Sequence, residues 1–309
     1  MAQPSIEIAD LLSATECGAT CAVAGLTQRD LLRCAAAYPD LFPARPFDPA
    51  FFSTIASANA FCAPWLSADR LRITNRITLW VFGLDRLIDH VSTTPAEVDD
   101  IVRRCLSAAA GTPSGDPLTG FLAEVRAELA GTPSFAALHD VWYDELRRML
   151  AAMAREWRWR MTGRLPTLDS YLDNAEFGFS VVYVSHWIAT TEPEDISDTA
   201  QLRAAGQAVQ RVIRLLNDLG TYQREMQTGD LNALRLADRQ TVEERIAIEA
   251  AHSRTLLAPL TPVHPRLVLF LRRQIDFNTG FYRITDYQGE LDTAPGAASP
   301  REPSGRQER

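Results

Sequence analysis

The chain has 309 residues, of which 46% are hydrophobic, and its formal net charge is −8 at pH 7. This apolar content is enough for a sizeable core, and the acidic balance argues against nonspecific attraction to nucleic acid. No stretch approaches the ~18 apolar residues of a membrane span, and the start of the chain lacks a basic segment followed by an apolar run. The five cysteines show no paired metal motif. We therefore expect a cytoplasmic protein with free thiols that binds neither nucleic acid nor membrane.

Apolar residues recur with the period of an α-helix along most of the chain, and no alternating strand pattern is found. Short Gly and Pro clusters separate the predicted helices, and none of them is long enough to link two domains. We therefore predict one all-α domain over residues 1–293 and a disordered tail rich in Pro, Gly and Ser over residues 294–309. The predicted helices cover residues 27–37, 48–60, 67–91, 95–110, 118–130, 134–161, 167–190, 198–227, 241–258 and 262–289.

The first informative segment is WVFGLDRLIDH at residues 80–90, where an apolar run leads into Asp85 and Asp89. Four residues apart, the two carboxylates share a helix face and repel each other unless a divalent cation binds between them. The alternative is an ordinary polar face that Arg86 and His90 partly neutralise. This segment alone leaves both interpretations open.

The second segment, RVIRLLNDLGTYQRE at residues 211–225, carries an amide, a hydroxyl and a carboxylate at i, i+4 and i+8: Asn217, Thr221 and Glu225. These oxygen donors form one stripe along a helix and suit Mg²⁺. Arg214 and Arg224 lie close to the same stripe, and their guanidinium groups suit a diphosphate. Ordinary Glu–Arg pairing on an amphipathic helix remains the alternative, although Asn and Thr are weak choices for it.

Together the two segments resemble the metal motifs of class I terpene synthases. DRLID at 85–89 is similar to the aspartate-rich motif, with Arg86 in place of its second aspartate, and NDLGTYQRE at 217–225 resembles (N/D)DxxSxxxE. The resemblance covers residues 65–290 and implies a helical bundle around a central apolar cavity. It places metal ligation on Asp85 and Asp89 from the first motif and on Asn217, Thr221 and Glu225 from the second.

Further likeness points to bacterial labdane-related diterpene synthases with a kaurene-synthase-like α domain. It is carried by residues 214–236 and by PTLDSYLDNAEFGFSVV at 166–182. Many bacterial sesquiterpene cyclases have a diphosphate-sensing arginine just after the Tyr171–Leu172 pair, and this chain lacks it. The resemblance implies that Arg214 substitutes for it, that Arg224 assists, and that Arg283 in FYRITDY contacts diphosphate when the site closes.

The implied activity is that of a terpene cyclase, a carbon–oxygen lyase that ionises an allylic diphosphate. The resemblance implies three Mg²⁺ ions in the closed complex and a bicyclic, copalyl-like diphosphate made by a separate class II cyclase. The resemblance is also compatible with a homodimer. The catalytic set is Asp85, Asn217, Thr221, Glu225, Arg214 and Arg224.

Each of the aromatic residues on helices expected to line the cavity is individually more typical of a core. These six residues are Trp80, Phe82, Phe177, Phe179, Trp187 and Tyr282. Only Phe82 and Phe177 are predicted to stabilise a carbocation through the negative face of their rings. The run REWRWR at 155–160 is interpreted as a helix exit whose arginines reach the solvent. His90 and His186 are predicted to be structural.

Two other functions stay open. One is a cyclase of linear geranylgeranyl or farnesyl diphosphate, which differs only in its substrate. The other is a noncatalytic α-helical protein that binds isoprenoids. Its mark would be lost metal ligands, whereas Asp85, Asn217, Thr221 and Glu225 are all present. A chain-elongating prenyltransferase would need a second aspartate-rich motif in place of NDLGTYQRE.

Overall fold

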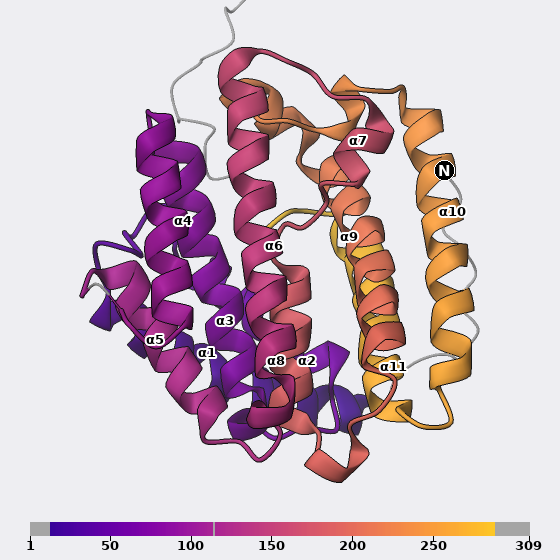
Figure 1. The fold of residues 1–309 in the computed structure, drawn as a ribbon. Helices are drawn as coiled ribbons and strands as arrows, with labels where there is room; N and C mark the ends of the chain where they lie inside the picture. The colour runs from indigo at the N-terminus through magenta and orange to yellow at the C-terminus, as the bar shows by residue number, and fades with distance from the viewer. Residues whose placement is uncertain (1–12, 114, 288–309) are drawn as a thin grey trace, which may run out of the picture.

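The computed structural model describes residues 13–113 and 115–287, and within these ranges the chain is helical and has no strand (Figure 1). The predicted all-α fold is confirmed. The predicted tail, residues 294–309, lies outside the described residues. The α-helices are α1 (Ala14–Ala37), α2 (Pro49–Cys62), α3 (Ala68–Arg86), α4 (Pro95–Ala109), α5 (Pro117–Ala130), α6 (Phe135–Thr162), α7 (Leu168–Leu172), α8 (Phe179–Thr190), α9 (Thr199–Thr228), α10 (Arg239–Leu257) and α11 (Pro265–Phe281).

Most helices begin where a side chain caps the first free backbone amides. The Thr94 hydroxyl accepts a hydrogen bond from the Glu97 amide, and the Glu97 carboxylate returns to the backbone of Thr94, which makes a capping box at the start of α4. Proline follows the cap directly in α2, α4 and α5, where its missing N–H costs nothing. Each such cap stabilises its helix by about 1 kcal/mol, so local sequence fixes these helix starts.

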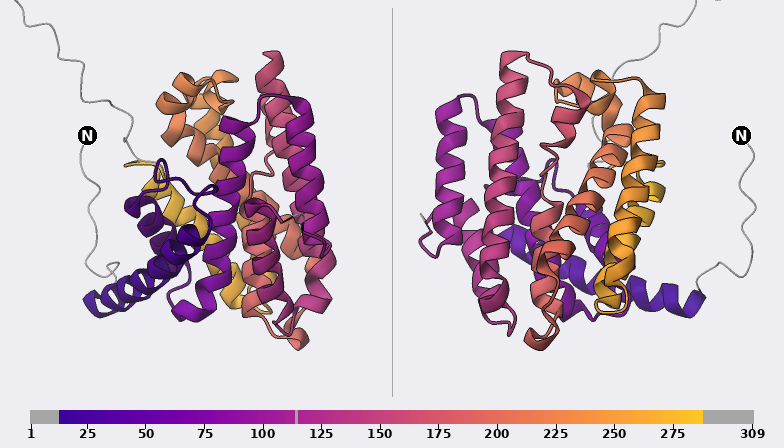
Figure 2. Two further views of the ribbon diagram at one scale, coloured as in Figure 1. Left: turned by 90° about the vertical axis from the view of Figure 1, so that its left-hand side faces the viewer. Right: turned by 45° about the vertical axis from the view of Figure 1, so that its right-hand side comes forward.

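The helices α3, α6, α8, α9 and α11 pack side by side, and α1 runs across them near one end of the bundle (Figure 2). Large side chains fill the space between neighbours. Trp142 on α6 is fully buried and donates its indole N–H to Ser185 on α8 at 3.0 Å. Trp80 on α3 is also fully buried and donates to the Leu118 carbonyl of α5 at 2.9 Å. Because each indole N–H donates to an oxygen acceptor, both rings can be buried without an unsatisfied hydrogen-bond donor.

Three predicted helix boundaries are wrong. The helix predicted from residue 27 already begins at Ala14, because Ser13 and Glu16 form a capping box. The helix predicted over 167–190 is broken into α7 and α8, because Gly178 adopts a φ of 126°. An added Cβ there would meet Val81 Cγ1 at 2.5 Å, so only glycine fits this contact. The last helix ends at Phe281, after which residues up to 287 form turns beside the bundle.

In the part of the chain that the structure describes, no helix has both the length and the apolar character needed to cross a membrane. All five cysteines are free thiols, as predicted.

Candidate functional site

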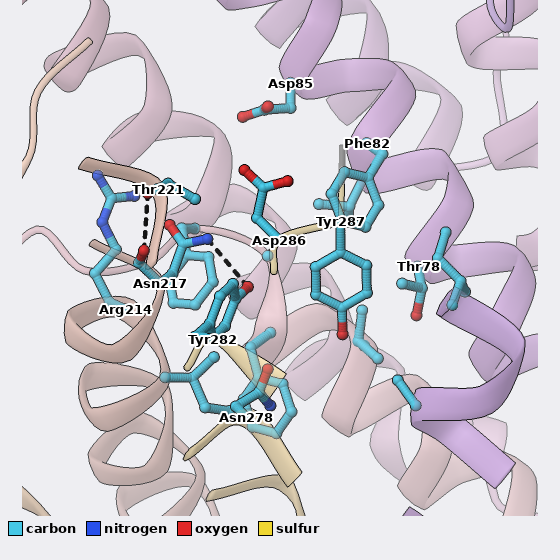
Figure 3. A pocket seen from close by; sticks show the side chains of 18 of the residues that line it. Thr78, Phe82, Asp85, Arg214, Asn217, Thr221, Asn278, Tyr282, Asp286 and Tyr287 are labelled. Carbon is cyan, nitrogen blue, oxygen red and sulfur yellow. Dashed lines mark hydrogen bonds between the residues drawn. The ribbon is translucent and has the colours of Figure 1, made fainter. Parts of the chain in front are cut away.

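The helices enclose a pocket of about 210 Å³. Apolar side chains cover much of its wall, and the two predicted metal motifs meet at one end (Figure 3). The lining residues come from α2, α3, the turn that follows α3, α6, the α7–α8 break, α8, α9, the loop after α9, α11 and the segment after α11. The predicted residues among them are Phe82, Asp85, Asp89, Phe177, Arg214, Asn217, Thr221, Arg224 and Glu225.

Asp85 and Asp89 lie where α3 changes its helical form. Asp85 belongs to the last turn of α3, and Asp89 to a π-helical turn, Leu87–Val91. Such turns are rare and often occur at functional sites. Burial raises the pKa of both carboxyl groups, and for Asp89 the neighbouring charge of Asp85 raises the pKa further. Two half-buried carboxylates on adjacent helical turns repel each other, and a bound cation would relieve that repulsion.

Arg160 holds the first motif against the loop that follows α9. Its guanidinium lies 2.6 Å from Asp230 Oδ1 and 3.3 Å from Asp89 Oδ1, and its Nη2 donates to the Asp89 carbonyl at 2.7 Å. The solvent-exposed interpretation of REWRWR is therefore wrong for this residue, which is only 15% exposed. Glu156 in the same run lines the pocket and was missed as well. In the sequence, Arg160 and Glu156 look like surface charges, because their contacts with Asp230 and Arg214 appear only in the folded structure.

The second motif forms the expected stripe on α9. The Thr221 hydroxyl donates to the Asn217 carbonyl at 2.8 Å, and Glu225 Oε2 accepts from the Asn232 amide at 2.9 Å. Asn217 Nδ2 donates to the Tyr282 hydroxyl at 3.0 Å (Figure 3). Because the amide nitrogen is engaged there, the Asn217 amide oxygen is left for another partner. Burial raises the pKa of Glu225.

Gly220 allows the segment after α11 to approach this stripe. An added Cβ would lie 2.9 Å from Tyr282 Cδ1 and 3.0 Å from the Tyr282 carbonyl oxygen. A glycine inside a helix costs about 1 kcal/mol relative to alanine, so it needs a compensating reason. Here the close contact with Tyr282 supplies that reason. The glycine inside NDLGTYQRE was the sequence signal that another segment approaches the helix at this point.

Asp218, between the predicted ligands, points away from the pocket. Its carboxylate accepts from the Tyr171 hydroxyl at 2.8 Å and from the Ala233 amide at 3.0 Å, and it is 1% exposed. Burial raises the pKa of Asp218 to about 7. This residue therefore anchors α9 to its neighbours, a role that the sequence reasoning did not assign.

The predicted diphosphate-binding arginines already have acidic partners. Arg214 lines the pocket, donates to Glu156, and donates to the Tyr171 hydroxyl at 2.5 Å. Its guanidinium also lies 5.6 Å from the centre of the Phe177 ring. Arg224 donates to Asp286 at 2.9 Å. Each arginine must exchange a carboxylate for the diphosphate that we predict it to bind.

Arg283 is exposed and is not among the residues that line the pocket, so its contact with diphosphate stays a prediction. Of the six aromatic residues considered, Trp80 and Trp187 are fully buried in the core, whereas Phe82, Phe177, Phe179 and Tyr282 line the cavity. Phe82 packs edge-on against Phe51, with the ring centres 4.9 Å apart.

His186 is buried, stacks on Phe270 with the ring centres 3.8 Å apart and lies 3.1 Å from the Thr74 hydroxyl. It is a core residue, in line with the structural role predicted for it. His90, in contrast, lines the pocket beside the first motif. Its predicted structural role is not tested by that position.

The donor set fits a hard divalent cation such as Mg²⁺. It consists of carboxylate, amide and hydroxyl oxygens, with no thiol at the pocket. Among residues 13–113 and 115–287 no group of three Asp, Glu, His or Cys side chains forms a metal site alone. The second motif instead offers a mixed set with one carboxylate, and the first motif faces it with two half-buried, mutually repelling aspartates.

Comparison with known proteins agrees with this geometry. Residues 76–255 match the family model of "Terpene synthase family 2, C-terminal metal binding". The chain is 26% identical over 273 residues to an ent-pimara-9(11),15-diene synthase from Streptomyces sp. (strain KO-3988), an alignment that covers 84% of this chain and 90% of that protein.

Two solved structures show the same fold. One is the 2-methylisoborneol synthase from Streptomyces coelicolor A3(2) in complex with Mg²⁺ and 2-fluoroneryl diphosphate, with a TM-score of 0.68, 17% identity, and 88% of this chain and 92% of that chain covered. The other is the linalool/nerolidol synthase from Streptomyces clavuligerus in complex with 2-fluorogeranyl diphosphate, with a TM-score of 0.68, 13% identity, and 84% and 97% covered. The chain therefore belongs to the terpene synthase family, whose members are lyases and cyclases that act on prenyl diphosphates.

Proposed function

We propose that the chain is a class I diterpene synthase that ionises a bicyclic labdane-type diphosphate and then cyclises or rearranges the carbocation. The observation that carries the proposal is the Asn217–Thr221–Glu225 stripe, which faces Asp85 at one end of a pocket whose wall also has an apolar part. The likeness to the ent-pimara-9(11),15-diene synthase along most of both chains supports a diterpenyl substrate. A separate class II cyclase would supply the bicyclic diphosphate.

The residues at the metal end would bind and orient the diphosphate. Asn217, Thr221 and Glu225 would hold one Mg²⁺ ion, and Asp85 with Asp89 would hold the others of a set of three. Bound Mg²⁺ acts as a Lewis acid that stabilises the charge developing on the leaving diphosphate. The guanidinium groups of the arginines on α9 add hydrogen bonds to the same oxygens as that charge develops.

The apolar part of the wall would protect the carbocation. Side chains such as Val81 and Ile213 offer no nucleophile and exclude bulk water, which would otherwise capture the cation. Phe82 and Phe177 line this part of the pocket, and the negative faces of their rings suit a passing cation. The 5.6 Å contact between Phe177 and Arg214 locates this ring near the diphosphate end.

Incubation with diphosphates of different skeletons tests the proposal. Purified protein and Mg²⁺ would be given a copalyl-type, a geranylgeranyl or a farnesyl diphosphate, and the extracts would be analysed by gas chromatography–mass spectrometry. A product from the bicyclic substrate alone that EDTA abolishes supports the proposal. A product from a linear substrate refutes the labdane assignment and retains the cyclase, whereas no product from any of them favours noncatalytic binding.

A further inference from the structure

Part of the pocket wall is polar and lies away from the metal motifs. Asn59 on α2, Thr78 on α3, and Gln274 and Asn278 on α11 form this part, which we name the polar floor. The three amide side chains are 4%, 6% and 3% exposed for Asn59, Gln274 and Asn278, so they are isolated from bulk solvent. In Figure 3, Asp85 lies at the upper end of the pocket, Thr78 at its right-hand side and Asn278 at its lower end.

The polar floor has hydrogen-bonding capacity that the protein does not use. Asn59 Nδ2 donates to Asn75 Oδ1 at 2.9 Å, and Asn278 Nδ2 donates to the Gln274 carbonyl at 2.7 Å. Neither amide oxygen accepts a hydrogen bond within residues 13–113 and 115–287. The Gln274 side-chain amide has no partner in that part of the chain. Donors and acceptors therefore both face the cavity.

Such groups are costly to bury without hydrogen-bond partners. A buried amide without a partner costs about 1–3 kcal/mol, so nearly all of them bind protein or an ordered water molecule. A water molecule needs 2–4 polar partners, and the polar floor supplies them from α2, α3 and α11. The Tyr287 hydroxyl points to the same lower part of the pocket (Figure 3). Burial raises the pKa of this tyrosine, so its hydroxyl stays protonated and can donate.

We propose that the polar floor holds a water molecule that ends the reaction by adding to the carbocation; this inference rests on the proposed function. The product would then be a terpene alcohol. An oxygen lone pair of the water forms the new C–O bond at the cationic carbon. The resulting oxonium loses one proton, and the diphosphate released in the ionisation step takes up that proton. No electron transfer is needed. A hydroxyl group on the substrate could satisfy the same amides, and the experiment below separates the two sources.

The test is turnover of the bicyclic diphosphate in H₂¹⁸O by the wild-type protein and by Gln274→Met. The wild-type product is expected to be an alcohol that carries ¹⁸O. Gln274→Met keeps the size of the side chain and removes its hydrogen bonds, so the alcohol fraction should fall about fivefold in favour of hydrocarbons, the effect of losing about 1 kcal/mol. Diphosphate release, measured in parallel, should stay near the wild-type rate. Asn278→Leu should shift the product in the same direction.

Leu271→Met is the matched control, because Leu271 lies one turn earlier on α11, is fully buried and does not line the pocket. Its product should equal that of the wild type. A wild-type product that is a hydrocarbon overturns the proposal. So does an alcohol without ¹⁸O, because its oxygen is then the ester oxygen of the diphosphate. Turnover restricted to a hydroxylated diphosphate also overturns it and assigns the floor to the substrate hydroxyl.

If the protein converts no diphosphate, the proposed function is refuted, and the water site can still be tested directly. In a crystal structure of the ligand-free protein, an ordered water within hydrogen-bonding distance of the Gln274 amide supports the site. A Gln274 amide bonded only to protein groups overturns it.

Discussion

Replacing Arg160 by Gln would remove the positive charge that joins the two metal motifs. In the wild-type protein this guanidinium contacts Asp230 at 2.6 Å and Asp89 at 3.3 Å. Glutamine can still donate a hydrogen bond, but it cannot neutralise the carboxylates. The metal-free variant should therefore be less stable than the wild type, and added Mg²⁺ should recover more stability in the variant, because the two carboxylates gain a replacement cation.

The size of the effect follows from the burial of the three side chains. Arg160, Asp89 and Asp230 are 15%, 30% and 18% exposed, so the contact is neither fully buried nor a surface pair. Breaking a buried pair costs about 3–5 kcal/mol and losing a surface pair less than about 1 kcal/mol, so about 2–3 kcal/mol is expected. For a chain of this length each kcal/mol lowers the melting temperature by roughly 1.5 °C, which predicts a fall of about 4 °C.

The assay is thermal unfolding with EDTA and with increasing Mg²⁺. Asp230→Asn is the matched partner: if the contact is as described, the loss in Arg160→Gln should shrink when Asp230→Asn is already present, because one of the unpaired charges is gone. A metal-free melting temperature within 1 °C of wild type in Arg160→Gln, on the scale of roughly 1.5 °C per kcal/mol, would refute the reasoning. Additive losses in the double variant would also refute it.

Three other predictions follow from single contacts. Asn217→Ala and Glu225→Ala should each nearly abolish diphosphate release while circular dichroism stays that of the wild type, and turnover at the wild-type rate in either variant would remove the proposed ligand. Gly220→Ala forces a Cβ against the segment after α11, so it should cost about 1–2 kcal/mol of unfolding free energy and raise the Mg²⁺ concentration needed for half-maximal activity. Gly25→Ala, with open space at the same atom, should stabilise its helix by about 0.5–1 kcal/mol, and equal effects of the two substitutions would contradict the contact. Burial lowers the pKa of His186 to about 3, so the unfolded chain takes up its proton first as pH falls below about 6.5, and stability should fall by up to about 1.4 kcal/mol per pH unit down to pH 3. Urea unfolding should show a shallower pH slope in His186→Leu, and an unchanged slope would rule the histidine out as the cause.

The second motif could be predicted because its geometry is local. Asn217, Thr221 and Glu225 lie on one helix at spacings of four, so their common face follows from helical periodicity alone. The pairing of that face with Asp85 followed from the family resemblance. Caps such as Thr94–Glu97 are equally local, and the predicted start of α4 at residue 95 agrees with the structure.

Features that depend on packing between distant segments could not be predicted in this way. Arg160 and Glu156 are ordinary charged residues in the sequence. Only the folded structure brings Glu156 into the pocket wall beside Arg214 and joins Arg160 to Asp89 and Asp230. The helix break at Gly178 depends on Val81, nearly a hundred residues earlier. Gln274 and Asn278 fit a solvated helix face equally well until α2 and α9 pack against α11.

The ion pair between Arg224 and Asp286 has a consequence for how ligands enter and leave. Asp286 lies on the segment that follows α11 and lines the pocket, so the arginine has a carboxylate partner before any substrate arrives. An incoming diphosphate would therefore exchange one anion for another, and the guanidinium need not pass through a state without a counter-ion. The same exchange in reverse would help the product diphosphate to depart, since the returning carboxylate competes for the site that the diphosphate occupies.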